Sequence, residues 1–397
     1  MPTAGNVQEL IEAIALVGRR NPSHPPLHEV EAFRHFFLPD GTIDYAGLDS
    51  RDGSCTRREL LLRFLVLNAV IDQGPDLAGV RALLISVTNR MYLDEIRFLH
   101  KPLMFFEALG LAIDQILEQH RSISAVRAVI WARENQSNAT RYNLFMDNSK
   151  QALSYAVFRW GVPIALPLLL ERDNKQAERG SAVLVDYLES WKSAEEMSQQ
   201  LKDNERYGLG KAIGDKACHL LAKWMVSSFR LSRRAEPSWG EFSFEVPYDS
   251  NAGRVLWRTG FLLKWASEKD YIKHEVIQPS VGKSGTDYIR VTNIRGMGTS
   301  EPLPHHLQPI YEDIAVNHLK THQKSPRKVE IQRIQHAYLK STFSTTNLGV
   351  ADFDEGLIHI GTQYCFNHAA PLCDKCPINS LCEGYQSNRR LIKDFRT

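Results

Sequence analysis

The chain has 397 residues, of which 43% are hydrophobic and 24% charged, as in an ordinary globular protein large enough for two or three lobes. The formal net charge is only +2, so any affinity for nucleic acid must come from a local basic patch. The first residues lack the basic-then-apolar pattern of a leader peptide, and the most apolar stretch, 152–170, contains Arg159, Gly161, Pro163 and Pro167. We therefore expect a cytoplasmic protein without a membrane span, in which this stretch forms two buried helical pieces.

The N-terminal half of the chain predicts mainly helices. Residues 1–56 alternate weak helical pattern with turn signals and form an N-terminal extension without evident chemistry. A helical core, 57–260, begins with a long apolar helix, a break at Gly74-Pro75, and an amphipathic helix for which Asp76 is the expected N-cap. Further helices are predicted near 103–119, 122–134, 150–171 and 182–202.

Two later segments of the core carry candidate chemistry. The segment LGKAIGDKACHLLAKWMVSSF places Gly214 two residues before Lys216, with Ala212 two residues before Gly214. A glycine turn at a helix N-terminus can direct backbone N–H groups at a phosphate. The segment FEVPYDSNAGRVLWRTG places Asp249 directly before a run with helical pattern that contains Arg254. Taken alone, Asp249 is an N-cap and Lys216 a surface charge.

Residues 261–351 are predicted to form an insertion with partly β structure. Its first half is rich in glycine and β-branched residues, and YIRVTNI alternates as a short strand would. Its second half predicts an amphipathic helix with an apolar side at Ile331, Ile334 and Tyr338. The basic residues there are Lys320, Lys324, Arg327, Lys328, Arg333 and Lys340, against one acid, Glu330. They form either a solvated face or a surface for DNA phosphates.

The C-terminal segment, 352–397, contains four closely spaced cysteines. Cys365, Cys373, Cys376 and Cys382 follow the spacing C-x7-C-x2-C-x5-C. Four thiolates in one short loop could form disulfides, hold zinc or ligate an iron–sulfur cluster. Disulfides fit poorly in a protein without a leader, and zinc sites usually offer two separated Cys-x2-4-Cys pairs, so the spacing favours the cluster over zinc. The remaining cysteines, Cys55 and Cys218, are expected to be reduced core thiols.

The cysteine loop resembles the C-terminal iron–sulfur loop of endonuclease III-type DNA glycosylases, the helix-hairpin-helix superfamily, whose usual spacing is C-x6-C-x2-C-x5-C. The segment around Gly214 and Lys216 resembles that family's hairpin, L-P-G-V-G-x-K-T-A, and the segment around Asp249 resembles its motif with the catalytic aspartate. The break at 72–76 is similar to a family turn whose glutamine enters the DNA stack. These features occur in the family's order, and the match to the hairpin departs at Ala212 and in its missing proline.

The resemblance implies a mainly α, two-lobed helix-hairpin-helix DNA glycosylase fold with a 4Fe-4S cluster on the four cysteines and a small, partly β insertion. Residues 1–56 and 352–397 are then expected to build the cluster-bearing lobe and the central helices the other. It also implies that Lys216 and Asp249 are catalytic. The implied DNA-binding residues are Gln73, Asp76, Gly214, Arg254, Lys324, Arg327 and Lys328. Gln73 could equally be an exposed turn residue.

The function implied by the resemblance is excision of a damaged or modified base from double-stranded DNA by a monomeric enzyme. Lys216 implies an associated abasic-site lyase activity through a Schiff base. The long core and the insertion suggest a bulky base, such as the glucosylated hydroxymethylcytosine of phage DNA, and hence a role in defence. The alternatives are repair of oxidised pyrimidines or 8-oxoguanine, a DNA-binding module without catalysis, and a zinc-bound RNA-binding protein.

Overall fold

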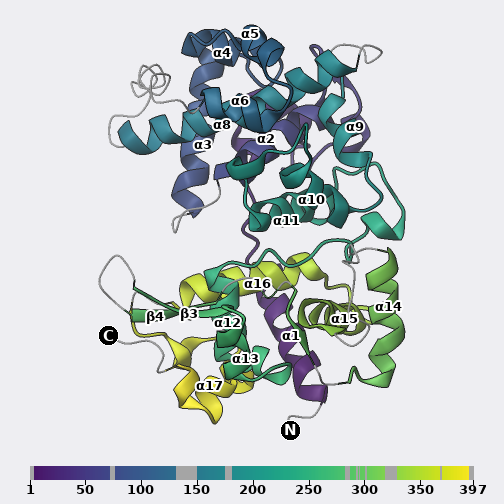
Figure 1. Ribbon diagram of the computed structural model, residues 1–397, viewed down its shortest axis with the longest axis vertical. Coiled ribbons are helices and arrows are strands. Elements are labelled where there is room, and N and C mark those ends of the chain that lie inside the picture. The colour runs from purple at the N-terminus through teal and green to yellow at the C-terminus, as the bar shows by residue number, and fades with distance from the viewer. Residues whose placement is uncertain are drawn as a thin grey trace. The chain divides into compact units, whose positions relative to one another are not determined.

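The computed structural model describes residues 4–71, 77–130, 150–174, 181–281, 287–291, 294, 296–299, 302–317, 329–366 and 369–392. Over this part of the chain the protein is mainly helical, with short two-stranded sheets, which confirms the predicted mainly α class (Figure 1). The chain divides into two compact units, Met1–Ser23 with Glu236–Thr397, and His24–Ala235. The boundaries between these units differ from the domain boundaries predicted after residues 56 and 260. Residues 24–56 belong to the unit of the central helices, and residues 236–260 belong to the C-terminal unit.

The central unit, His24–Ala235, is a packed set of helices (Figure 1). They are α2 (Arg57–Ile71), α3 (Leu77–Leu93), α4 (Leu103–Leu109), α5 (Ile113–Gln119), α6 (Ile123–Ile130), α8 (Lys150–Asp173), α9 (Val183–Glu189), α10 (Ala194–Asp203) and α11 (Asp215–Lys223). Helix α2 is mostly apolar and is buried on all sides from Arg58 to Ile71, together with its polar residues Glu59, Arg63 and Asn68. It packs against α8, α9 and α11 and so forms the centre of this unit.

Three helix predictions in the central unit are wrong in detail. The expected helix 182–202 forms two helices, α9 and α10, and Ser193 is the N-cap of the second. The expected helix 103–119 is interrupted where Gly110 adopts a left-handed φ of 69° and ends α4. The apolar stretch 152–170 forms one helix, α8, which continues through Pro163 and Pro167. From Trp160 to Leu170 this helix is almost entirely buried, so tertiary packing outweighs the helix-breaking effect of the prolines. Among the described residues, no helix is both long and apolar enough to cross a membrane.

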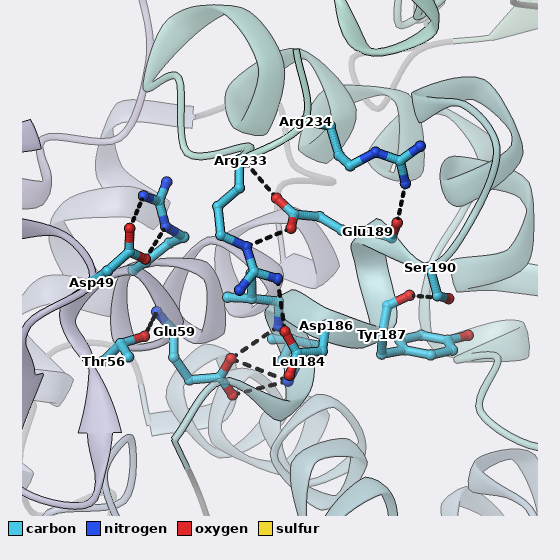
Figure 2. A network of polar contacts seen from close by, with 12 residues as sticks. Asp49, Thr56, Glu59, Leu184, Asp186, Tyr187, Glu189, Ser190, Arg233 and Arg234 are labelled. Carbon is cyan, nitrogen blue, oxygen red and sulfur yellow. Dashed lines mark hydrogen bonds and ion pairs between the residues drawn. The ribbon is translucent and has the colours of Figure 1, made fainter. Parts of the chain in front are cut away.

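A buried ion pair fixes α9 to α2 in the central unit. Glu59 is fully buried, and its carboxylate accepts hydrogen bonds from the backbone N–H groups of Leu184 and Val185 at the start of α9 (Figure 2). Its other partner is Arg63, whose Nε lies 2.8 Å from Glu59 Oε1. The carboxylate thus neutralises a buried cation and satisfies the first N–H groups of a helix, which water cannot reach.

A second group of polar contacts holds the last residues of the central unit in place. Arg233 bonds Glu189 Oε2 through Nε at 2.7 Å and Asp186 Oδ1 through Nη2 at 2.7 Å, both on α9 (Figure 2). Arg234 donates to the carbonyl oxygens of Glu189 and Trp191. These contacts tie the segment after α11 back onto α9.

The C-terminal unit combines the first helix of the chain with everything after residue 235 (Figure 1). Its helices are α1 (Ala4–Arg20), α12 (Ser250–Arg258), α13 (Glu268–Lys273), α14 (Gln308–Asn317), α15 (Ile331–Phe343), α16 (Val350–Gln363) and α17 (Glu383–Gln386). Helices α1 and α16 pack side by side at a very short separation, because a Cβ added at Gly356 would lie 1.9 Å from the Ile14 carbonyl oxygen. Glycine is therefore required where these two helices meet.

The insertion contains the predicted strand, but its helix differs from the prediction. Strand β4 (Asp287–Val291) pairs antiparallel with β3 (Ile277–Val281), which confirms the short strand expected at this place. Helix α15 is buried on most of its surface and does not present a basic face along its length. Arg333 is 3% exposed and its Nε lies 2.6 Å from Glu330 Oε2, and Lys340 pairs with Asp313.

Candidate active site and cysteine pocket

The four C-terminal cysteines line one pocket of the C-terminal unit, which encloses about 370 Å³ of space, part of it open to solvent. Val255, Ile360, Ile378 and Ile392 supply apolar walls. None of the six cysteines, all of which lie among the described residues, forms a disulfide. Four sulfur atoms around one largely apolar hollow are the donor set expected of a four-cysteine site for zinc or an iron–sulfur cluster.

Burial affects the protonation state of two of these thiols. Burial raises the pKa of Cys376 to about 12 and that of Cys382 to about 11. Hydrogen bonds from the backbone N–H groups of Ile378 and Tyr385 lower these pKa values and so oppose the effect of burial. Such thiols remain protonated at neutral pH unless a metal replaces the proton. The same N–H groups are of the kind that stabilises ligated sulfur. The residues present therefore fit a metal centre, and ligation would add directly to the stability of the loop.

Helix α12 joins the cysteine loop to Asp249. Arg258, near its end, donates through Nη1 to Cys365 Sγ at 3.4 Å and to the Phe366 carbonyl at 3.2 Å. Arg254, one turn earlier, donates to the Cys365 carbonyl and, at 2.8 Å, to the Gly361 carbonyl at the end of α16. The spacing of four residues places both guanidinium groups on one helix face. The loop that carries the first cysteine is thereby fixed to α12.

The predicted DNA contact of Arg254 is not supported by its position. Arg254 is only 6% exposed, and its guanidinium is occupied by the contacts to Cys365 and Gly361 and by Asn251 Oδ1 at 2.7 Å. A buried arginine that satisfies carbonyl groups cannot also reach a phosphate on the surface. Arg254 is thus a structural residue of the cysteine loop, and the expectation of direct DNA binding is corrected.

Asp249 is the N-cap of α12. Its Oδ1 accepts hydrogen bonds from the backbone N–H groups of Asn251 and Ala252, both at 2.8 Å. The side chain is partly exposed, and the positive end of the helix dipole favours its negative charge. The structure therefore holds this carboxylate in one orientation at the start of the helix that supports the cysteine loop.

In the central unit, α10 and α11 form two helices joined by a tight connection. The residue with positive φ in this connection is Gly210, at 56°, two positions before Ala212. Ala212 lies in a single 3-10 turn, Gly210–Ala212, so its methyl group meets no conformational obstacle. Gly214 is the exposed N-cap of α11 at negative φ, and Lys216 is half-buried in the first turn of that helix.

A buried polar pair links the two helices of this hairpin. His219 of α11 and Glu195 of α10 are 3% and 1% exposed, and His219 Nδ1 lies 3.4 Å from Glu195 Oε2. Gln199 Nε2 donates to Glu195 Oε1 at 3.0 Å. The pair belongs to the packing of the hairpin. Lys216 and Asp249 lie in different units of the chain.

A second pocket, which the sequence interpretation missed, lies in the C-terminal unit. Its polar lining consists of Glu245, Tyr248, Gln332, Gln335 and His336. Three of these residues follow the helical spacing i, i+3 and i+4 on α15, and Tyr248 directly precedes Asp249. Polar residues at this spacing within a helix that also has an apolar side are a sequence signal for a polar pocket.

Five of the expected DNA-binding residues, Gln73, Asp76, Lys324, Arg327 and Lys328, lie outside the described residues. Comparison with known proteins adds no identification, because no family model, no curated protein and no solved structure matches the chain. The geometry of the two units and the sequence motifs are therefore the basis for assigning a function.

Proposed function

We propose that the protein is a helix-hairpin-helix DNA glycosylase with a 4Fe-4S cluster on Cys365, Cys373, Cys376 and Cys382. The observation that carries the proposal is the role of α12. One short helix holds the candidate catalytic carboxylate at its N-cap and, through Arg254 and Arg258, the loop of the four cysteines. In this combination a metal centre stabilises the loop that fixes the catalytic helix in place.

Asp249 acts at the sugar. When the C1′–N bond breaks, positive charge develops on the deoxyribose, and a carboxylate of fixed orientation stabilises it. The two backbone N–H groups at the start of α12 hold Asp249 for this task, so little reorganisation is needed during the reaction.

Lys216 supplies the nucleophile of a bifunctional enzyme. Its neutral amine attacks C1′, the base leaves with the bonding electrons, and the resulting Schiff base permits β-elimination and strand cleavage. The backbone around Gly214, at the exposed start of α11, is suited to contact a DNA phosphate. The substrate is a damaged or modified base, with bulky phage-type cytosines and oxidised bases as the two candidate groups.

The test is a base-release and nicking assay with anaerobically purified protein, on damaged duplexes and on modified phage DNA, with Lys216→Gln and Asp249→Asn beside the wild type. We expect base release that requires Asp249 and a borohydride-trapped adduct that requires Lys216. Release without trapping would leave a monofunctional glycosylase. No release from any substrate, with DNA binding retained, would favour the non-catalytic binding module, and a colourless protein that contains zinc would refute the cluster.

A further inference from the structure

Three side chains of α15 form hydrogen bonds with the stretch of chain that leads into Asp249. The stretch is 242–248, and the pairs, each an α15 residue with its partner, are Gln332 with Glu245, Gln335 with Tyr248 and His336 with Phe242. The α15 residues follow the spacing i, i+3 and i+4, so they lie on one face of the helix. One helix therefore holds this stretch at three points.

The pair nearest to Asp249 is Tyr248 with Gln335. Burial raises the pKa of Tyr248, so its hydroxyl keeps its proton and donates to Gln335 Oε1. Gln335 is only 4% exposed, so water has little access to replace the hydroxyl if it is removed. Because Tyr248 directly precedes Asp249, this hydrogen bond holds the chain one residue away from the carboxylate.

The stretch before Asp249 has no regular structure of its own. Residues 245–249 belong to neither a helix nor a strand, and Pro247 has no backbone N–H group to donate. The course of the chain here depends on side-chain contacts, because ladder hydrogen bonds do not hold it. The bonds from the N–H groups of Asn251 and Ala252 fix the Asp249 carboxylate only relative to α12. Contacts from outside α12 must fix how the chain enters this helix.

Helix α15 is suited to be a rigid support. Most of its residues are buried, and it packs against α14 and α1. Lys340 of α15 pairs with Asp313 of α14, which ties the two helices together. A catalytic group must be held within about 0.5 Å of its productive position, and helices achieve this better than loops do.

We infer that Tyr248 and Gln335 are positioning residues for Asp249. Through their hydrogen bond, α15 holds the carboxylate at the place where it acts on the sugar. Because α15 lies within 261–351, the inference gives this predicted insertion a role in the reaction. It rests on the proposed glycosylase function and names the support of its catalytic group.

The experiment uses the full-length protein with Tyr248→Phe, Gln335→Met and the double variant. The first change removes the donor of the hydrogen bond and the second removes its acceptor. Tyr311→Phe is the matched control, because the Tyr311 hydroxyl accepts from the Glu330 backbone N–H at 3.2 Å, at the start of α15 and away from 242–248. Each protein is measured for single-turnover base release, for DNA affinity, and for hydrogen exchange of the backbone amides of Asn251 and Ala252. The exchange measurement requires no catalysis.

We expect Tyr248→Phe and Gln335→Met each to slow base release about tenfold or more while DNA affinity is unchanged, because displacement of a catalytic group by about 1 Å can cost about 10²-fold. The double variant should be no slower than the slower single variant, since one hydrogen bond can be lost only once. The amides at the start of α12 should exchange about fivefold faster, which corresponds to about 1 kcal/mol for one hydrogen bond. Tyr311→Phe should match the wild type in rate and in exchange.

An unchanged rate in both folded variants would overturn the inference, as would an equal loss in Tyr311→Phe or additive losses in the double variant. If neither Tyr248→Phe nor Gln335→Met folds, the hydrogen bond serves the fold of the unit and the inference is also wrong. Failure of the proposed function appears separately, as wild-type protein that releases no base from any duplex. The exchange of the α12 amides then decides alone whether α15 holds Asp249, and unchanged exchange would refute it.

Discussion

Asp249 has both a structural and a proposed catalytic role, and replacing it with two different residues separates them. Asparagine is as good an N-cap as aspartate, so Asp249→Asn should retain the hydrogen bonds to Asn251 and Ala252 while removing the charge. Alanine removes both. We expect Asp249→Ala to lower the free energy of unfolding by about 1 kcal/mol and Asp249→Asn to change it by only a few tenths.

The two variants should nevertheless have similar activity. Loss of one preorganised electrostatic group at a reacting centre typically reduces turnover by about 10²–10³-fold, which corresponds to about 2.7–4 kcal/mol of transition-state stabilisation. Single-turnover base release and urea denaturation measure the two quantities. Ser267→Ala is the matched control, because it removes an N-cap in the same unit, on α13, without touching the proposed chemistry.

The refuting result concerns the asparagine variant. If Asp249→Asn releases base at the wild-type rate, the carboxylate is only a helix cap and the catalytic assignment is wrong. If Ser267→Ala also lost activity, any loss in Asp249→Ala would reflect stability and carry no information on catalysis.

Three further predictions concern the surrounding structure. Arg258→Met removes the N–H contact to Cys365 Sγ, so we expect less iron per protein after anaerobic purification and weaker visible absorption; full iron content would contradict this. Glu59→Gln leaves the buried Arg63 without its principal counter-ion, and urea denaturation should show a loss of about 3 kcal/mol, whereas a neutral effect would show that water reaches the site. Burial lowers the pKa of His336, so the unfolded chain binds a proton more readily. Its contribution to stability is complete above about pH 6.5 and declines as pH falls below that value. His336→Gln should reduce this decline in pH-dependent unfolding, and an identical pH profile would refute it.

The cysteine pocket was the part of the site most accessible to sequence analysis. Cys365, Cys373, Cys376 and Cys382 lie in one short loop, so chain connectivity alone keeps their sulfur atoms near one another. Asp249 as an N-cap was equally local, because the cap depends on the N–H groups of Asn251 and Ala252, two and three positions later. The helical class followed from the periodicity of apolar residues, which needs no knowledge of what packs against them.

The side chains of α12 and α15 could not be interpreted in the same way. From sequence alone, a basic residue is expected to be exposed. Arg254 is buried nevertheless, because carbonyl groups more than 100 residues away in the chain accept its hydrogen bonds. The polar stripe of α15 has meaning only beside Glu245 and Tyr248, each 87 residues from its glutamine partner. No pattern among neighbouring residues of the sequence predicts such pairs.

The sequence by itself therefore determined the helical class, the grouping of the four cysteines and the helix start at Asp249, because each depends on residues within a few positions of one another. Only the tertiary structure decided that residues 24–56 join the central unit and not the C-terminal unit, that Arg254 supports the cysteine loop, and that two glutamines of α15 line a pocket. The physical reason is that the burial of a side chain depends on which distant element covers it, and that choice follows from packing of the whole unit.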